Sequence, residues 1–186
     1  RMPALGETLI GNSFNLGPGG KGSNQAVASA KSGAKTRLIT KLGNDTFSKM
    51  ALNIWEKSNV IAEIEISNSK STGAACVFLD ASSGDNAIIV CTGVADDISP
   101  DYVKEKETII CNSKVLLTQL EQPIESASTG LAIAKKNKVL TILNPAPAPT
   151  VALPKELYKL CDFITPNETE AELITGIKVD SEASAN

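Results

Sequence analysis

The clearest hydrophobic pattern in the chain predicts an amphipathic helix that begins after residue 45. Apolar side chains recur there at spacings of three and four residues and so share one helical face: Phe47, Met50, Ala51, Ile54 and Trp55. The preceding Asn44-Asp45 supplies an N-cap. Between residues 60 and 95 the pattern changes to short apolar runs, which predict strands over 61–66, 73–79 and 87–91.

Beyond residue 100, predicted strands and helices alternate. Apolar runs predict strands over 115–120, 139–143 and 163–165, with helices after Pro123 and Asn167. Repeated strand–helix units indicate an α/β fold with a parallel sheet and helices on its faces. Ligands of such sheets bind beyond the carboxyl ends of the strands. Polar residues follow three predicted strands at those ends: Glu121, Asn144 and the segment from Asn167 to Glu170.

A glycine-rich stretch, Gly17-Pro18-Gly19-Gly20-Lys21-Gly22, leads into a run of small helix-forming residues. This pattern predicts a loop whose backbone approaches a ligand closely, followed by a helix that ends at about Ser32. Lys21 and Asn24 would meet a polar or anionic ligand at the positive end of that helix. A tight turn before a packed helix explains the glycines equally well. Residues 7–16, which precede the glycines, are predicted to form one or two strands.

The glycine stretch also fits the GxGxxG fingerprint of dinucleotide-binding proteins, with Asp45 at about the distance of the acidic residue. The match is weak, because no strand leads directly into the loop and Pro18 lies within it. The stretch does not fit a P-loop, since Asn15 stands at a glycine position and Gly22 follows the lysine. An oxidoreductase is therefore a remote alternative.

The polar residues at the strand ends also have purely structural explanations. Asn167, followed three residues later by Glu170, resembles a helix capping box. Glu121 fits a solvated carboxylate at the start of a helix, where the helix dipole stabilises it. The prolines that follow Asn144 fit a rigid connector. These explanations leave the function of each segment open.

Composition and charge narrow the classes of function. The chain has 186 residues, of which 42% are hydrophobic and 21% charged, as is usual for a globular protein. A net charge of −3 without a basic run argues against a nucleic-acid surface, and we expect no membrane partner. Because the chain lacks histidine and its four cysteines are widely spaced, we expect no zinc site. Three of the cysteines lie in or beside apolar runs, so we expect them to pack as small buried thiols, which suits a reducing compartment.

Five segments together resemble the ribokinase-like (PfkB-type) carbohydrate kinases, in the order and spacing of that family. They are Gly19–Ala28, Lys41–Phe47, Gln119–Glu121, Leu143–Ala148 and Thr165–Glu172. The resemblance implies a three-layer α/β/α fold with a mostly parallel sheet and a small β-sheet lid. The whole chain, 1–186, would be one partial domain with lid segments at about 5–16 and 71–95. It also implies a cytoplasmic protein that pairs through the lid as a homodimer.

The activity that this resemblance implies is ATP-dependent phosphorylation of the 5-hydroxyl of D-ribose, with Mg²⁺ and with K⁺ as activator. Lys21 and Asn24 would donate hydrogen bonds to the sugar. Asn167 would contact the ATP phosphates, and Glu170 would act on Mg²⁺ through water. The residues that the resemblance assigns to the sugar are Gly20, Lys21, Gly22, Ser23, Asn24, Glu121 and the apolar lid positions Ala75, Val77 and Val90.

The chain departs from the family pattern in several places. Ser23 stands where alanine is usual, and Gly93–Asp97 replaces the usual Gly-Ala-Asn run. The family's first strand, which carries a sugar-binding aspartate, would precede Arg1. The C-terminal half, with the anion hole, the catalytic base, most of the adenine pocket and the K⁺ site, would follow Asn186. We therefore expect the N-terminal part of a kinase, inactive alone. The alternatives are a kinase for deoxyribose or another furanose, and a non-catalytic sugar-binding module.

Overall fold

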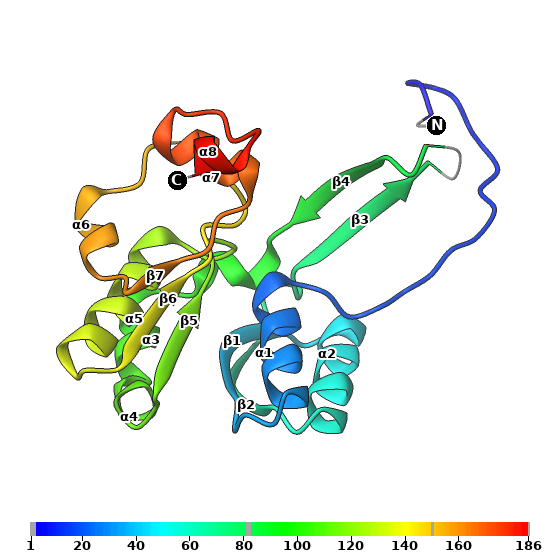
Figure 1. Cartoon of the computed structure of the whole chain (residues 1–186). Helices are drawn as coiled ribbons and strands as arrows, with labels where there is room; N and C mark the ends of the chain where they lie inside the picture. The colour runs from blue at the N-terminus through cyan, green and yellow to red at the C-terminus, as the bar shows by residue number, and fades with distance from the viewer. Residues whose placement is uncertain (1–2, 81–82, 150, 186) are drawn as a thin grey trace. The chain divides into compact units, whose positions relative to one another are not determined.

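The computed structural model describes residues 3–80, 83–149 and 151–185. The chain divides into two compact units, residues 1–94 and residues 95–186, which we call unit 1 and unit 2 (Figure 1). The elements of unit 1 are α1 (Lys21–Lys31), β1 (Arg37–Gly43), α2 (Thr46–Lys57), β2 (Ile61–Ser67), β3 (Ala74–Leu79) and β4 (Asn86–Cys91). A short 3-10 helix, η1 (Gly93–Asp97), joins the units.

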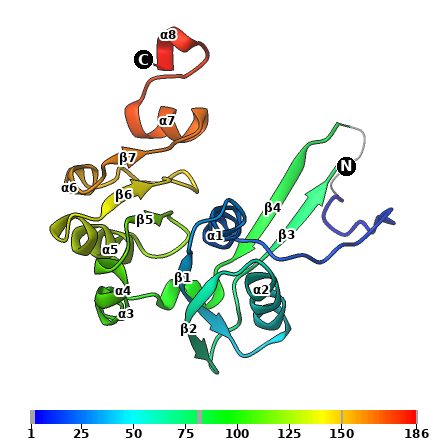
Figure 2. The ribbon, with the colours of Figure 1, turned by 60° about the horizontal axis from the view of Figure 1, so that its bottom comes forward.

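Unit 1 is built on a two-stranded parallel sheet, β1–β2, with helices α1 and α2 packed on one face (Figure 2). Its core consists of Ala26, Leu42, Trp55 and Val60. The amphipathic helix predicted after residue 45 is confirmed as α2. The other face of the sheet carries two ion pairs between the strands, Arg37–Glu63 and Lys41–Glu65.

An antiparallel ribbon, β3–β4, projects from unit 1 (Figure 1). Its register runs from Ala74 opposite Cys91 to Leu79 opposite Asn86, so the strands predicted there are confirmed. The prediction of strands over 7–16 is wrong, because that segment pairs with no strand in the described chain. The segment is also not packed into a hydrophobic core, because its large apolar side chains are exposed: Leu9, Ile10, Phe14 and Leu16.

The cysteines are less buried than expected. Cys76 and Cys91 lie on the β3–β4 ribbon and are exposed, as are the apolar side chains on both faces of the ribbon. Cys111 and Cys161 are half-buried, and all four are free thiols. The prediction that three of the four thiols are buried is therefore wrong, because two of the four are exposed.

Unit 2 contains a three-stranded parallel sheet in the order β5–β6–β7. Its elements are α3 (Pro100–Glu105), α4 (Glu107–Cys111), β5 (Val115–Thr118), α5 (Ile124–Lys136), β6 (Leu140–Leu143), α6 (Lys155–Lys159), β7 (Phe163–Ile164), α7 (Glu168–Thr175) and α8 (Glu182–Ala185). Side chains from α5, α6 and the sheet form its core around Leu131, Leu143, Leu153 and Leu157. The predicted α/β class, with parallel sheets and a small antiparallel pair, is confirmed. No helix among the described residues is long and apolar enough to span a bilayer.

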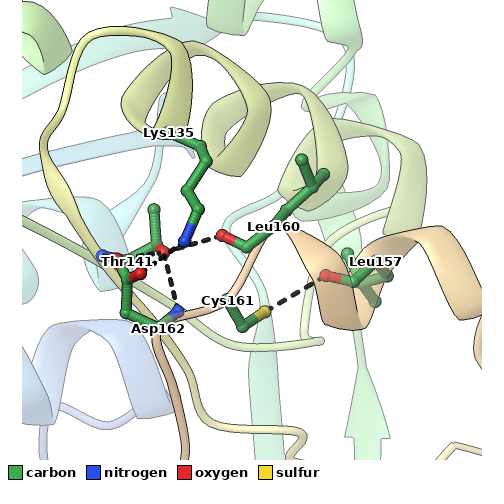
Figure 3. A network of polar contacts seen from close by, with 6 residues as sticks. All are labelled: Lys135, Thr141, Leu157, Leu160, Cys161 and Asp162. Carbon is green, nitrogen blue, oxygen red and sulfur yellow. Dashed lines mark hydrogen bonds and ion pairs between the residues drawn. The ribbon is translucent and has the colours of Figure 1, made fainter.

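A polar network fixes the amino end of β6 (Figure 3). Thr141 is fully buried, and its Oγ1 lies 2.7 Å from the carbonyl oxygen of Leu160 and 2.9 Å from Oδ2 of Asp162. The backbone N–H of Asp162 donates to Thr141 Oγ1 at 3.0 Å, and Lys135 pairs with the Asp162 carboxylate. The network therefore ties α5, β6 and the turn before β7 together at the amino ends of the strands. The polar residues predicted for a site follow the opposite, carboxyl ends.

Candidate functional site

The glycine-rich stretch, residues 17–22, leads into the first turn of α1. Gly20 is the N-cap residue with φ of 86°, a conformation that glycine adopts without strain. The helix begins at Lys21, so Lys21 and Gly22 are helical rather than part of the predicted loop. At the other end, Ser32 is the C-cap, so the helix ends where the sequence predicts, and Gly33 that follows has a positive φ.

The first turn of α1 presents its backbone N–H groups without a side-chain cap at Gly20. The N–H of Asn24 donates to the carbonyl oxygen of Gly20 at 2.9 Å and closes the turn. No acidic residue lies in this turn. In any α-helix the first backbone N–H groups point out of the helix toward its start, where the helix dipole is positive. The turn can therefore bind the oxygens of a ligand.

Ser23 has a role that the sequence analysis did not find. Its Oγ accepts a hydrogen bond from Nε1 of Trp55 at 2.8 Å, which joins the first turn of α1 to α2. A tryptophan that is only 2% exposed needs an acceptor for its indole N–H. The burial of this aromatic residue was predictable from periodicity, but the position of its partner 32 residues away was not.

The base of the β3–β4 ribbon is bound to the start of α2. Asp45 caps that helix by accepting from the N–H of Ser48 at 2.8 Å, so the predicted N-cap is confirmed. The Asp45 carboxylate also accepts from Thr72, from its N–H at 2.7 Å and its Oγ1 at 2.9 Å. Burial alone would raise the pKa of Asp45, but the hydrogen bonds from Thr72, Ser48 and Phe47 together lower it. The carboxylate thus anchors the ribbon in its ionised form.

Three glycines allow the backbone segments at this base to approach one another closely. A Cβ added to Gly43 would lie 2.5 Å from the N atom of Thr72, and one added to Gly73 would lie 2.7 Å from the carbonyl oxygen of Thr92. At Gly93, which has φ of 57°, the added Cβ would lie 2.3 Å from the carbonyl oxygen of Ser71. The three positions therefore admit no side chain as the backbone stands.

The first turn of α1 and the base of the ribbon lie at the same end of unit 1. Because α1 joins β1 by a short turn and packs against it, α1 runs antiparallel to β1 and begins near its carboxyl end. Gly43, the last residue of β1, donates to Thr72 Oγ1 at 2.9 Å at the base of the ribbon. Figures 1 and 2 show the chain entering α1 at the end of unit 1 from which β3 and β4 project.

The three predicted apolar lid positions share one face of the ribbon. Ala75 pairs with Val90, and Val77 pairs with Ile88, so alternation places Ala75, Val77 and Val90 on the same side. Val77 is 57% exposed and Val90 61% exposed. This face is therefore an uncovered apolar surface.

Three polar segments of unit 2 meet at the carboxyl ends of the strands, as the topology predicts. The N–H of Asn144 donates to the carbonyl oxygen of Thr118 at 2.9 Å, and its Nδ2 donates to that of Thr165 at 2.8 Å. The N–H of Leu120 donates to Ala146 at 2.9 Å. Glu121, half-buried, comes directly after Leu120. The segments after β5, β6 and β7 are thus joined by hydrogen bonds at one edge.

Asn167 and Glu170 form the capping box of α7. Oδ1 of Asn167 accepts from the N–H of Glu170 at 2.8 Å, and Oε2 of Glu170 accepts from the N–H of Asn167 at 2.9 Å. Glu170 is 5% exposed. The structural explanation of this pair is confirmed. Contact with a nucleotide or a metal stays a prediction for both residues.

Comparison with known proteins identifies the family. Residues 2–186 match the model of the pfkB family carbohydrate kinases, and the chain belongs to that family. It is 41% identical over 181 residues to ribokinase of Haemophilus influenzae, which covers 97% of this chain and 58% of that protein. It is 35% identical over 182 residues to deoxyribokinase of Salmonella typhi, covering 97% of this chain and 59% of that protein.

A solved structure gives the same result for the fold. The structure of Arabidopsis thaliana ribokinase complexed with ribose and ATP matches with a TM-score of 0.84 at 30% identity. The match covers 99% of this chain and 60% of that one. The chain therefore spans about 60% of the length of the relatives that it matches.

Proposed function

We propose that the chain is the sugar-binding, N-terminal part of an ATP-dependent kinase that phosphorylates the 5-hydroxyl of D-ribose. The observation that carries this proposal is the first turn of α1, an uncapped helix start with Lys21 and Asn24, in a chain of the pfkB family. Its 41% identity to a ribokinase supports ribose as the acceptor. In the reaction, the 5-hydroxyl oxygen attacks the γ-phosphorus, the bond to the ADP oxygen breaks, and the hydroxyl proton passes to a base outside this chain.

The sugar is bound by polar groups at the first turn of α1 and by an apolar lid. Lys21 and Asn24 donate to sugar hydroxyls, together with the backbone N–H groups from Gly20 to Ser23. Glu121 accepts hydrogen bonds from the sugar. The β3–β4 ribbon is the lid, and its Ala75, Val77 and Val90 face covers the sugar. Closing an apolar surface over the acceptor excludes water and so protects the phosphoryl group from hydrolysis.

ATP is bound through residues of unit 2 with the help of Mg²⁺. Asn167 contacts the phosphates, and Glu170 acts on Mg²⁺ through water. The described residues contain no group of three or more acidic, histidine or cysteine side chains able to hold a metal. A single carboxylate that acts through water, as proposed for Glu170, suits Mg²⁺. This ion usually keeps several waters and binds one or two carboxylates together with substrate phosphates. The resemblance assigns the K⁺ activator site to residues outside this chain.

The lid also supports a proposal about assembly. Ribbon β3–β4 has exposed apolar side chains on both faces, including Val77, Phe78, Ile88 and Ile89. We infer that the lid pairs two copies of the kinase in a homodimer, which would cover much of this surface. The two exposed thiols of the ribbon suit a reducing, cytoplasmic location.

Calorimetric titration with ribose tests the sugar-binding role. The wild-type chain is expected to bind ribose, and Asn24→Ala to weaken the affinity about tenfold because a hydrogen bond to a hydroxyl is lost. Lys35→Ala, an exposed lysine in the turn after α1, is the matched control and should leave the affinity unchanged. Absence of ribose binding, or equal loss in both variants, would contradict the proposal. The chain alone should release no ADP with ribose and ATP, because the base lies outside it.

A second candidate is a kinase for deoxyribose. The observation that favours it is the 35% identity to a deoxyribokinase over 97% of the chain. The two sugars differ by one hydroxyl, and a site built to bind that hydroxyl rejects the sugar that lacks it. Titrating the chain with 2-deoxyribose under the same conditions separates the candidates. Tighter binding of ribose supports the first, and tighter binding of deoxyribose the second.

A further inference from the structure

Trp55 is the one tryptophan of the sequence, and it joins α2 to the first turn of α1. Its side chain is 2% exposed and lies in the core of unit 1 with Ala26, Leu42 and Val60. Its Nε1–H donates to Ser23 Oγ at 2.8 Å. Because a buried indole N–H without an acceptor is destabilising, this bond restrains both groups.

The hydrogen bond from Trp55 acts on the first turn of α1. The first N–H groups of a helix have no intrahelical partners, so the first turn moves more readily than the turns that follow. Gly20 offers no side-chain cap, and glycine adds its own backbone freedom. Ser23 lies two residues after Lys21 and directly before Asn24. Fixing Ser23 therefore restricts the directions in which both donor side chains can point.

The helix that supplies the restraint is itself fixed. The start of α2 is held by the capping box of Asp45 and Ser48, and the same Asp45 carboxylate binds Thr72 at the base of the ribbon. The apolar face of α2 packs on the β1–β2 sheet. Trp55 therefore extends from a well-anchored helix toward Ser23 in the first turn of α1.

We propose that Trp55 is a positioning residue, which holds the first turn of α1 in its sugar-binding geometry through Ser23. The inference rests on the proposed function, in which that turn binds the sugar. Ser23 departs from the family pattern at a position where alanine is usual, and the hydrogen bond to Trp55 gives the hydroxyl a role.

Calorimetry with ribose on four variants tests the inference. Ser23→Ala and Trp55→Phe each remove the hydrogen bond, and each should weaken ribose affinity about fivefold. The double variant should be no weaker than the more affected single variant, because both changes remove the same bond. Ser23→Thr keeps an acceptor oxygen and should retain most of the affinity. Wild-type affinity in Ser23→Ala would overturn the inference.

A control variant separates positioning from loss of stability. Leu38 packs against the same core from β1, so Leu38→Ala destabilises unit 1 without removing the hydrogen bond. It should lower the melting temperature at least as much as Ser23→Ala but leave the ribose affinity within about twofold of wild type. An equal loss of affinity in Leu38→Ala would show that stability alone accounts for the effect and would overturn the inference.

Amide hydrogen exchange keeps the inference testable if the proposed function fails. If the wild-type chain binds no ribose, the proposed function is contradicted, and the exchange rates of residues 21–24 become the readout. Faster exchange there in Ser23→Ala and Trp55→Phe, but not in Leu38→Ala, supports positioning by Trp55. Unchanged exchange in the two variants that lack the bond overturns it.

Discussion

Replacing Gly93 with alanine tests how tightly the base of the β3–β4 ribbon is packed. Gly93 has φ of 57°, and its added Cβ would lie 2.3 Å from the carbonyl oxygen of Ser71 and 3.0 Å from Gly73 N. These are backbone atoms, so the segment over 71–73 must move. Four hydrogen bonds of 2.7 to 2.9 Å hold that segment: Val94 N–H to Ser71 O, Gly43 N–H to Thr72 Oγ1, and Thr72 N–H and Oγ1 to Asp45.

The expected loss of stability can be worked from these contacts. The left-handed conformation alone disfavours alanine by about 1 kcal/mol. Loss of two of these four hydrogen bonds adds about 2 kcal/mol, so Gly93→Ala should lower the free energy of unfolding by about 3 kcal/mol. Gly33→Ala is the matched control, because Gly33 also has a positive φ, of 93°, but nothing lies within 4 Å of its added Cβ. It should lose only about 1 kcal/mol.

Urea unfolding followed by tryptophan fluorescence measures this difference. Trp55 is the one tryptophan of the sequence and lies in unit 1, so the signal reports the unit that contains both glycines. Gly93→Ala should unfold at lower urea than Gly33→Ala with a similar slope. Equal midpoints for the two variants would refute the conclusion that close backbone approach holds the base of the ribbon.

Three further predictions concern unit 2. Thr141→Val removes the buried hydroxyl near Leu160 and Asp162 and should destabilise the unit by about 2 kcal/mol, measured by urea unfolding followed by circular dichroism. Hydrogen bonds from Lys135 and Thr141 lower the pKa of Asp162 from 3.8 to about 2. The ionised carboxylate therefore stabilises the folded state fully above pH 3.8, and this stabilisation is lost as the pH falls toward 2. Across this pH range the melting temperature of the wild type should therefore fall more than that of Asp162→Asn. An equal fall in both proteins would contradict a stabilising role for the Lys135–Asp162 ion pair. Asn167→Ala should weaken the α7 cap by about 1 kcal/mol, whereas Asn167→Ser keeps it. If Asn167 contacts ATP, the ATP affinity falls in both variants. An unchanged ATP affinity in Asn167→Ser would show that Asn167 serves only as the N-cap of α7.

Local patterns predicted the elements whose stability depends on nearby residues. Helix α2 could be predicted because its apolar positions and its N-cap Asp45 lie within one short segment. The capping box of Asn167 and Glu170 could be predicted for the same reason. Alternation of strands and helices also predicted that Glu121 and Asn144 follow parallel strands at one edge of a sheet.

Tertiary partners could not be predicted in this way. Residues 7–16 have the composition of strands, but a strand exists only when another strand pairs with it. The apolar run around Cys76 suggested burial, yet the ribbon that it forms has both faces exposed. The bonds of Ser23 to Trp55 and of Thr72 to Asp45 join residues 32 and 27 positions apart, and no spacing rule connects them.

The central claim is that the glycine-rich first turn of α1 recognises the sugar acceptor and does not hold ATP. Backbone amide chemical shifts in an NMR titration of the chain test this claim most directly. Ribose should shift the amides of Gly20, Lys21, Gly22, Ser23 and Asn24, while Mg-ATP should shift those around Asn167 and leave the first turn unchanged. Shifts of the first turn with ATP or NAD, and none with ribose, would contradict the account.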